Sequence, residues 1–188
     1  MGLYKYLREL WNRPSDSNGY KELIIELRRE PATLRIEKPT RLDRARSVGY
    51  RAKQGVIVVR QRVSAGGHKT GKPAGGRKTK RATPRVALTK NHKQIAEERA
   101  SRKYPNCEVL NSYLLASDSK NHWFEVILID RTHPAVLADA NLKTIAKQRG
   151  RAQRGLTSAA RKSRGLRGKG KGYEKARPSK AANKGRTN

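Results

Sequence analysis

The sequence has little of several residue types, and each shortage excludes a class of protein. Its 188 residues include one cysteine, Cys107, so the chain cannot form an internal disulfide, which indicates a reducing compartment. No apolar run approaches the roughly 18 residues that a membrane-spanning helix needs, so we expect no membrane partner. The first residues, Met1 to Tyr6, lack the apolar core and small-residue cleavage site of a secretory signal. These shortages predict a cytoplasmic protein.

Acidic residues are also scarce: 15 Asp and Glu stand against 45 Lys and Arg, for a formal net charge of +30. Residues 66–85 hold seven basic residues and no acid, and residues 147–188 hold fifteen basic residues and one acid, Glu174. Neither segment can bury enough apolar surface to offset its ordering entropy. We therefore predict a single globular domain, residues 1–146, interrupted by a basic loop at about 65–86 and followed by a basic C-terminal extension, residues 147–188.

The apolar pattern of the body predicts both helices and strands. Predicted helices cover residues 3–11, the stretch from Tyr20 to Pro31, residues 41–53, residues 91–104 and two short segments after Pro134. Predicted strands cover 32–38, 55–64, 107–115 and 122–130, the last two as a hairpin. On the third strand, alternation predicts one shared face for Cys107, Val109, Asn111, Tyr113 and Leu115. This order predicts an α+β fold: a small, mostly antiparallel four-stranded sheet packed with helices, plus the long non-globular basic loop and C-terminal extension.

The patterns typical of catalytic and metal sites are incomplete or absent in this sequence. Gly66 to Lys72 fits the G-x-x-x-x-G-K spacing of a phosphate-binding loop, but Pro73 stands where a Mg²⁺-binding hydroxyl is required. The histidines and Cys107 show no metal-ligand spacing. Asp43 is expected to orient neighbouring guanidinium groups, and the pair Glu97 and Glu98 to lie on a solvated helix face. We therefore predict no enzyme, no cofactor, no metal and no small-molecule substrate.

The basic segments favour nucleic acid as the partner. The planar fork of Arg binds phosphate bidentately, and the glycines between residues 150 and 172 permit close approach of the backbone. Tyr173 offers a ring for stacking on an unpaired base, whereas Trp123 is expected in the core. No helix-turn-helix, zinc finger, basic zipper or RNP motif is visible, which favours a folded RNA recognised by shape and phosphates. A DNA-compacting protein is the alternative.

Several longer runs resemble a known family. They include Arg35 to Arg46, Gly49 to Gly55, Ile95 to Arg99, Val109 to Tyr113, Trp123 to Leu128 and Arg154 to Ala159. By these runs nearly the whole chain resembles the large-subunit ribosomal protein fifteen-e family of archaea and eukaryotes, and its length is similar to that of archaeal members. The resemblance implies a structural protein of the cytoplasmic ribosome without catalytic residues. Its implied partners are large-subunit rRNA and neighbouring large-subunit ribosomal proteins.

The resemblance and the charge pattern together give a set of candidate rRNA-binding residues. The predicted helix 41–53 is expected to dock on RNA, while loop 66–85 and the extension 147–188 are expected to thread between RNA helices. Loop 64–82 departs from the family, because Ala, Gly and Thr replace several basic residues there. The candidates are Arg41, Arg44, Arg46, Arg51, Lys53, Lys69, Lys72, Arg77, Lys78, Lys80, Arg81, Arg149, Arg151, Arg154, Arg161, Lys162, Arg164, Arg167, Lys169 and Lys171.

Overall fold

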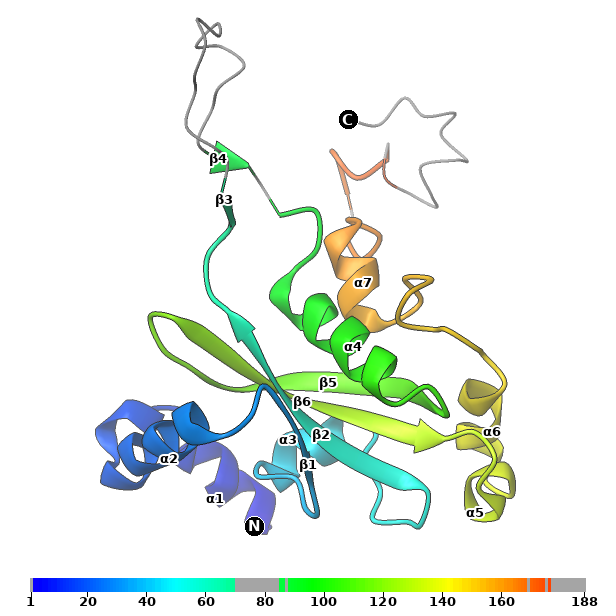
Figure 1. Cartoon of the computed structure of the whole chain (residues 1–188), viewed down its shortest axis with the longest axis horizontal. Helices are drawn as coiled ribbons and strands as arrows, with labels where there is room; N and C mark the ends of the chain where they lie inside the picture. The colour runs from blue at the N-terminus through cyan, green and yellow to red at the C-terminus, as the bar shows by residue number, and fades with distance from the viewer. Residues whose placement is uncertain (1, 70–84, 87, 169, 175, 177–188) are drawn as a thin grey trace, which may run out of the picture.

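Four antiparallel strands form the centre of the chain. The structure is a computed structural model, and it describes residues 2–69, 85–86, 88–168, 170–174 and 176. The sheet has the order β1-β2-β6-β5, and helices pack on both of its faces (Figure 1). Its strands are β1 (Thr33–Ile36), β2 (Val56–Ser64), β5 (Cys107–Ser117) and β6 (Asn121–Asp130). The predicted α+β fold with a four-stranded sheet is confirmed.

Strand β6 lies inside the sheet and is apolar on both faces. Phe124, Val126 and Leu128 belong to the core on one face, while Ile127 and Ile129 belong to clusters on the other. The predicted single face of β5 is wrong, because its pairing with β6 shifts at two irregularities, between Val109 and Asn111 and between Leu114 and Ala116. An extra residue in a strand moves the following side chains to the opposite face. Val109 and Tyr113 therefore enter different clusters.

Helix α4 (His92–Lys103) covers one face of the sheet. The Asn91 side chain begins the helix by accepting a hydrogen bond from the Gln94 N–H at 2.8 Å. Its Ala96 and Ala100 are fully buried against the strands. On the side of α4 away from the sheet lies α7 (Ser158–Ser163), where the carbonyl of Ala159 accepts a hydrogen bond from Asn91 Nδ2 (Figure 1). The chain is therefore layered here as sheet, α4 and α7.

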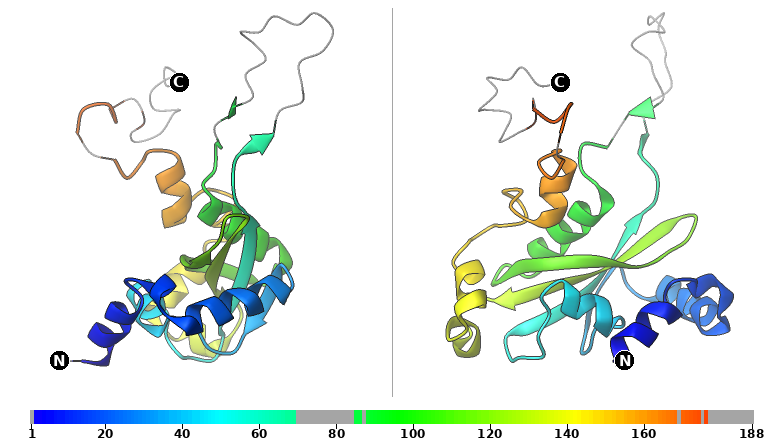
Figure 2. Two further views of the ribbon diagram at one scale, coloured as in Figure 1. Left: turned by 90° about the vertical axis from the view of Figure 1, so that its left-hand side faces the viewer. Right: turned by 180° about the vertical axis from the view of Figure 1, so that it is seen from behind.

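The remaining helices cover the opposite face and the ends of the sheet (Figure 2). Trp123 is the largest fully buried side chain on this side, and its Nε1 donates to the carbonyl of Leu27 at 3.1 Å. Val136, Leu142 and Ala146 pack on Ile129. The helices are α1 (Leu3–Leu10), a 3-10 turn η1 (Pro14–Asp16), α2 (Asn18–Arg29), α3 (Leu42–Ser47), α5 (Pro134–Leu137) and α6 (Ala140–Ala146).

The helix predicted over residues 41–53 is shorter in the structure. Helix α3 ends at Ser47, and Gly49 adopts a left-handed conformation with φ of 103°. The following residue, Tyr50, is buried, and its N–H donates to the carbonyl of Ala45 at 2.9 Å. A left-handed glycine and a buried aromatic residue directly after a helix turn the chain away from the helix axis. Arg51 and Lys53 therefore lie on a loop instead of a helix.

Two short strands mark the base of the basic loop. Strand β3 (His68–Lys69) pairs with β4 (Arg85–Val86) in an antiparallel ladder, which leads away from the central sheet (Figure 1). The Nε2 of His92 donates to the carbonyl of Gly66 at 2.9 Å and so joins the start of the loop to α4. Residues 70–84 lie outside the described residues, so the prediction for the interior of the loop stays a prediction.

The first part of the basic extension differs from the sequence-based expectation. Ala152, Thr157, Ala159 and Ala160 are buried, and α7 packs on α4. The buried side chains of this segment are small. They contribute little apolar area, and they leave no conspicuous hydrophobic pattern in the sequence. Residues 177–188 lie outside the described residues, and the boundary predicted at residue 146 stays a prediction.

We predict that replacing Gly55 by Ala strongly destabilises the chain. Gly55 has φ of 81°, and an added Cβ would stand 2.7 Å from His133 Cγ and 2.8 Å from Val136 Cγ2. The left-handed backbone costs a residue with a Cβ roughly 1–2 kcal/mol, and overpacking adds about 1–3 kcal/mol. Urea unfolding of the purified chain measures the change.

Gly66→Ala is the matched control for this substitution. Gly66 has φ of 91°, but nothing lies within 4 Å of an added Cβ. Only the backbone cost, roughly 1–2 kcal/mol, is expected there. Equal loss of unfolding free energy in the two variants would contradict the packing of Gly55 against His133 and Val136.

Candidate nucleic-acid interface

Exposed charge in the central part of the chain is of one sign. Within the described residues between 38 and 173, no acidic side chain is exposed; the exposed acids are Glu9, Glu22, Glu26, Glu37 and Glu174. The exposed basic side chains in the same range are Lys38, Arg44, Arg46, Arg51, Lys53, Lys90, Arg99, Arg102, Lys103, Lys120, Lys143, Lys147, Arg149, Arg154, Arg161, Lys162, Arg164, Arg167 and Lys171. Such a surface attracts a polyanion, because few nearby carboxylates screen its field.

The candidates around α3 differ in their contacts. Arg44 is exposed, whereas Arg41 lies over the Trp11 ring, 4.7 Å from its centroid, and 3.5 Å from Asp43. The prediction that Asp43 orients a guanidinium is confirmed for Arg41. Arg46 donates a hydrogen bond to the Tyr4 hydroxyl, and its guanidinium lies over that ring. Two of the three arginines are thus held in fixed positions by aromatic side chains.

Two loop candidates share one carboxylate. Asp139 Oδ2 lies 2.8 Å from Lys53 Nζ and 3.6 Å from Arg51 Nη1. The other oxygen of Asp139 accepts from the N–H of Asn141 and Leu142 at the start of α6. The Lys53 ammonium, followed by these backbone N–H groups, lowers the pKa of Asp139 below its usual range. The loop after α3 is therefore joined to α6 through a single ionised side chain.

Glu125 positions the segment that leads into α3. This buried carboxylate accepts from the Thr40 N–H at 3.1 Å and from the Thr40 hydroxyl at 2.6 Å. It also accepts from the Tyr113 hydroxyl and lies 3.4 Å from Arg60 Nη2. Burial, followed by the charge of Glu125, raises the pKa of Tyr113, so the phenol stays protonated and remains a donor. One buried acid thus joins Thr40 to the central sheet.

Glu108 fixes the start of the basic extension on β5. Its two carboxylate oxygens accept from the N–H of Gly150 at 2.7 Å and of Arg151 at 3.1 Å. Arg151 Nη1 in turn donates to the carbonyls of Val109 and Leu110, both at 2.8 Å. Burial lowers the pKa of Arg151 from its usual value. Arg151 therefore fastens the extension to the sheet, unlike the exposed candidates around it. Its contact with rRNA stays a prediction.

The expectation that Glu97 and Glu98 lie on a solvated helix face is wrong. Both are buried, since the outer side of α4 is covered by the extension and α7. Glu97 accepts a hydrogen bond from the Ser112 hydroxyl, and burial raises its pKa. Glu98 accepts from Lys90 Nζ at 2.8 Å and from Gln94 Nε2 at 2.9 Å. Helical periodicity on α4 could not reveal a second layer formed by residues some sixty positions later in the chain.

A basic hollow of about 260 Å³ lies between α4 and the extension. Its lining includes Lys90, Arg154 and Arg164, from two segments that are distant in the sequence. Arg164 Nη2 donates to the carbonyl of Gly155 at 2.6 Å, which fixes one wall. Three cationic side chains around one hollow suit a backbone phosphate. Lys90 was not among the sequence-predicted residues, and no local pattern marks it.

The remaining candidates fall into two groups. Arg149, Arg161 and Lys162 are exposed, and Arg167 is exposed with its Nη1 donating to Ser158 Oγ at 2.5 Å. Lys171 is exposed beyond α7, and Lys69 contributes backbone to β3. Outside the described residues lie Lys72, Arg77, Lys78, Lys80, Arg81 and Lys169, so the phosphate-loop motif that ends at Lys72 is described only in its first half.

Other kinds of site find little support in the described part of the chain. No three His, Cys, Asp or Glu side chains there come together as a metal site would require. None of its helices combines the length and apolar character needed to cross a membrane. Cys107 is buried in the core, as predicted, and burial, followed by the charge of Asp130, raises its pKa to about 11. Its thiol is therefore protonated at neutral pH.

We predict that Glu108→Gln loosens the extension without unfolding the sheet. The amide keeps one acceptor oxygen but directs an N–H₂ group at a backbone donor, and hydrogen bonds to charged groups contribute about 1.5–3 kcal/mol. Hydrogen exchange of the purified chain should accelerate in residues 150–165 and remain slow in β6. Glu37→Gln, at an exposed acid, should change neither. Unaltered exchange at residues 150–165 would remove Glu108 from this role.

We also predict a pH effect from Glu97. Its pKa in the folded chain is raised above the ordinary value near 4.5, so the folded state binds a proton more tightly than the unfolded state. Its contribution is therefore favourable below the ordinary pKa and is lost as pH rises through the raised folded pKa. Denaturant unfolding at several pH values should show that Glu97→Gln gains stability relative to wild type as pH rises through this window. A relative loss would give the opposite sign and contradict the assignment.

Known proteins resemble this chain over nearly its whole length. The ribosomal family model described as Ribosomal L15 (L15e type) matches residues 2–183. The chain is 50% identical over 187 residues to the large ribosomal subunit protein eL15 of Methanocorpusculum labreanum, covering 97% of this chain and 96% of the relative. It is 49% identical over 191 residues to the eL15 protein of Methanospirillum hungatei, covering 98% and 97%. The relatives are named as ribosomal proteins, not as enzymes. The resemblance to the large-subunit ribosomal protein fifteen-e family, stated from the sequence, is confirmed. This chain belongs to the L15e family of ribosomal proteins.

Proposed function

We propose that this chain is a structural component of the large ribosomal subunit in the cytoplasm and binds folded large-subunit rRNA through its Arg and Lys side chains. The observation that carries the proposal is the one-signed surface: between residues 38 and 173, the described part of the chain exposes many basic side chains and no acidic one. Its relatives bear the name of large-subunit proteins. No catalytic step is required for this function.

The buried acids support a pre-organised phosphate-binding surface. Glu125 positions the approach to α3, and Glu108 holds the start of the extension. As a result, Arg44, Arg154 and Arg161 belong to segments whose backbone is packed on the rest of the protein. Pre-organisation lowers the ordering cost of binding, and each neutralised phosphate releases counterions. The body thus provides a fixed basic platform for a shaped polyanion.

RNA is favoured over duplex DNA as this polyanion. Helices α3 and α7 each have six residues, and neither continues as the longer recognition helix that major-groove readers use. Basic residues are distributed over α3, α4 and the extension, which suits phosphates arranged on a folded RNA. The basic loop 66–85 and the end of the extension, which lie largely outside the described residues, are proposed to thread between rRNA helices.

Salt dependence tests the proposal. In Arg154→Gln/Arg161→Gln/Lys162→Gln, three exposed cations are removed from the extension. The slope of log K against log salt for a large-subunit rRNA fragment should flatten by roughly 2–3, at about 0.7–0.9 for each phosphate that the variant no longer neutralises. Fluorescence anisotropy over a salt series measures this slope.

The matched control removes three exposed cations from the N-terminal helices, as Arg8→Gln/Lys21→Gln/Arg29→Gln. It has the same change in net charge, and its slope should remain close to that of wild type. Equal flattening in both variants would show that only net charge matters and would contradict a defined rRNA surface. Equal affinity for duplex DNA at matched salt would favour the DNA-compacting alternative.

A further inference from the structure

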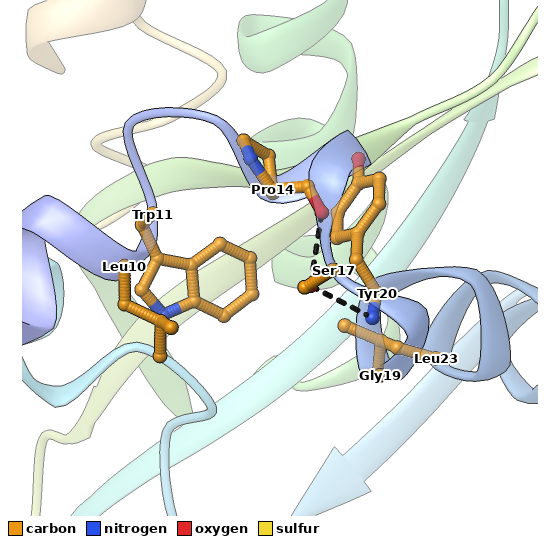
Figure 3. Close-up of a pocket in the computed structure, with 7 residues that line it drawn as sticks. All are labelled: Leu10, Trp11, Pro14, Ser17, Gly19, Tyr20 and Leu23. Carbon is orange, nitrogen blue, oxygen red and sulfur yellow. Dashed lines mark hydrogen bonds between the residues drawn. The ribbon is translucent and has the colours of Figure 1, made fainter.

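An apolar pocket lies where the N-terminal helices meet. It has a volume of about 310 Å³ and is lined mainly by Leu10, Trp11, Pro14, Tyr20 and Leu23. Figure 3 shows the Trp11 and Tyr20 rings among the lining side chains, and the two rings meet edge to face with centroids 6.2 Å apart. This volume is at the lower end of the roughly 300–1,000 Å³ typical of ligand pockets.

Helix α1 extends the apolar pocket into a larger uncovered surface. None of its residues is buried, and Leu3, Tyr6 and Leu10 are 64%, 59% and 65% exposed. We call these three side chains and the pocket the N-terminal apolar surface. A helix of eight residues is far below the roughly 12–15 residues at which isolated helices become even marginally stable, so helices of this length depend on packing. The exposed apolar side chains of α1 indicate that such packing comes from outside the chain.

The N-terminal apolar surface stands in a part of the chain with little net charge. Residues 2–30 contain six basic and five acidic residues, a net charge of +1, whereas residues 31–188 carry +29. The exposed acids Glu9, Glu22 and Glu26 belong to α1 and α2, where they stand among exposed cations of the same helices. A surface that mixes carboxylates with cations is a poorer match for phosphates than the one-signed surface between residues 38 and 173, and its exposed apolar side chains suit an apolar protein surface.

An unpaired base suits the pocket less well than an apolar side chain. The Arg41 guanidinium already lies over the Trp11 ring, and the Arg46 guanidinium over the Tyr4 ring, so stacking on those ring faces is blocked. Ser17, a polar residue of the lining, already donates to the Pro14 carbonyl at 3.0 Å and accepts from the Tyr20 N–H at 3.3 Å (Figure 3). The polar edge of a base would lose hydrogen bonds to water in such a pocket.

We infer that the N-terminal apolar surface docks an apolar segment of a neighbouring protein in the large subunit, with a large aliphatic or aromatic side chain of that protein in the pocket. The inference rests on the proposed function, since it places the chain in the large subunit. It divides the molecule into two binding faces. The basic surface from α3 to the extension binds rRNA, and the two N-terminal helices bind protein.

Site-directed photo-crosslinking in assembled large subunits tests this inference. The full chain carries p-benzoylphenylalanine in place of Tyr6 in one variant and in place of Arg161 in the other. Tyr6 is 59% exposed and Arg161 is exposed, so both substitutions leave the core unchanged. After irradiation of purified subunits, the Tyr6 probe should be joined to a different ribosomal protein, whereas the Arg161 probe should be joined to rRNA.

The two probes separate the failure of this inference from that of the proposed function. If the Tyr6 probe is joined to rRNA, to a second copy of this chain or to nothing, the docking inference is overturned, while an rRNA product at Arg161 leaves the proposed function intact. If the Arg161 probe yields no rRNA product, the proposed rRNA surface itself fails.

A second pair of variants tests the apolar contact directly. Leu10→Ala and Glu9→Ala each truncate one exposed side chain of α1 to a good helix former. With the Tyr6 probe present, Leu10→Ala should lower the protein crosslink by roughly tenfold, the effect of removing one central interface side chain. Glu9→Ala should keep the parent yield. An equal yield in both variants would overturn the role of the apolar pocket.

Discussion

Placing acids in the interior of a strongly basic chain is the constraint on which this structure depends. A net charge of +30 makes any compact form self-repulsive, and carboxylates next to backbone donors or cations offset part of that repulsion. In the part of the chain whose burial is described, five acids are buried: Asp43, Glu97, Glu98, Glu108 and Glu125. Glu97, Glu108 and Glu125 each accept hydrogen bonds from another segment of the chain. These buried acids organise the fold, and between residues 38 and 173 the described part of the surface exposes only cations among its charged groups.

This arrangement explains how a binding surface for a polyanion can exist without its ligand. Glu108 and the Arg151 guanidinium together fasten the start of the extension to β5. The small residues Ala152, Ala159 and Ala160 then bring the chain close to α4, and the exposed arginines stand on its outer side. Part of the ordering entropy is thus lost during folding and need not be lost again on binding. Under the proposed function, the polyanion meets cations that are already grouped.

The N-terminal helices have a different surface chemistry from the rest of the chain. They carry a net charge of +1, expose Leu3, Tyr6 and Leu10, and enclose an apolar pocket beside Trp11. Arg41 and Arg46 connect this region to α3 by lying over Trp11 and Tyr4. The same two arginines therefore stand at the boundary between the apolar and basic surfaces. This division matches the two proposed contacts, because interfaces with nucleic acid are more polar and more basic than interfaces with protein.

Local periodicity and composition were enough to predict the α+β class, the strands of the central hairpin, the burial of Trp123 and Cys107, and the basic character of the surface. Family membership was also evident from runs such as Trp123 to Leu128. Four properties became visible only in the folded chain: the burial of Glu97 and Glu98, the opposite faces of Val109 and Tyr113, the loop position of Arg51 and Lys53, and the contact of Arg151 with β5. These properties depend on β-bulges, on a left-handed glycine and on a second layer contributed by distant residues. Local patterns carry no record of contacts between segments far apart in the chain.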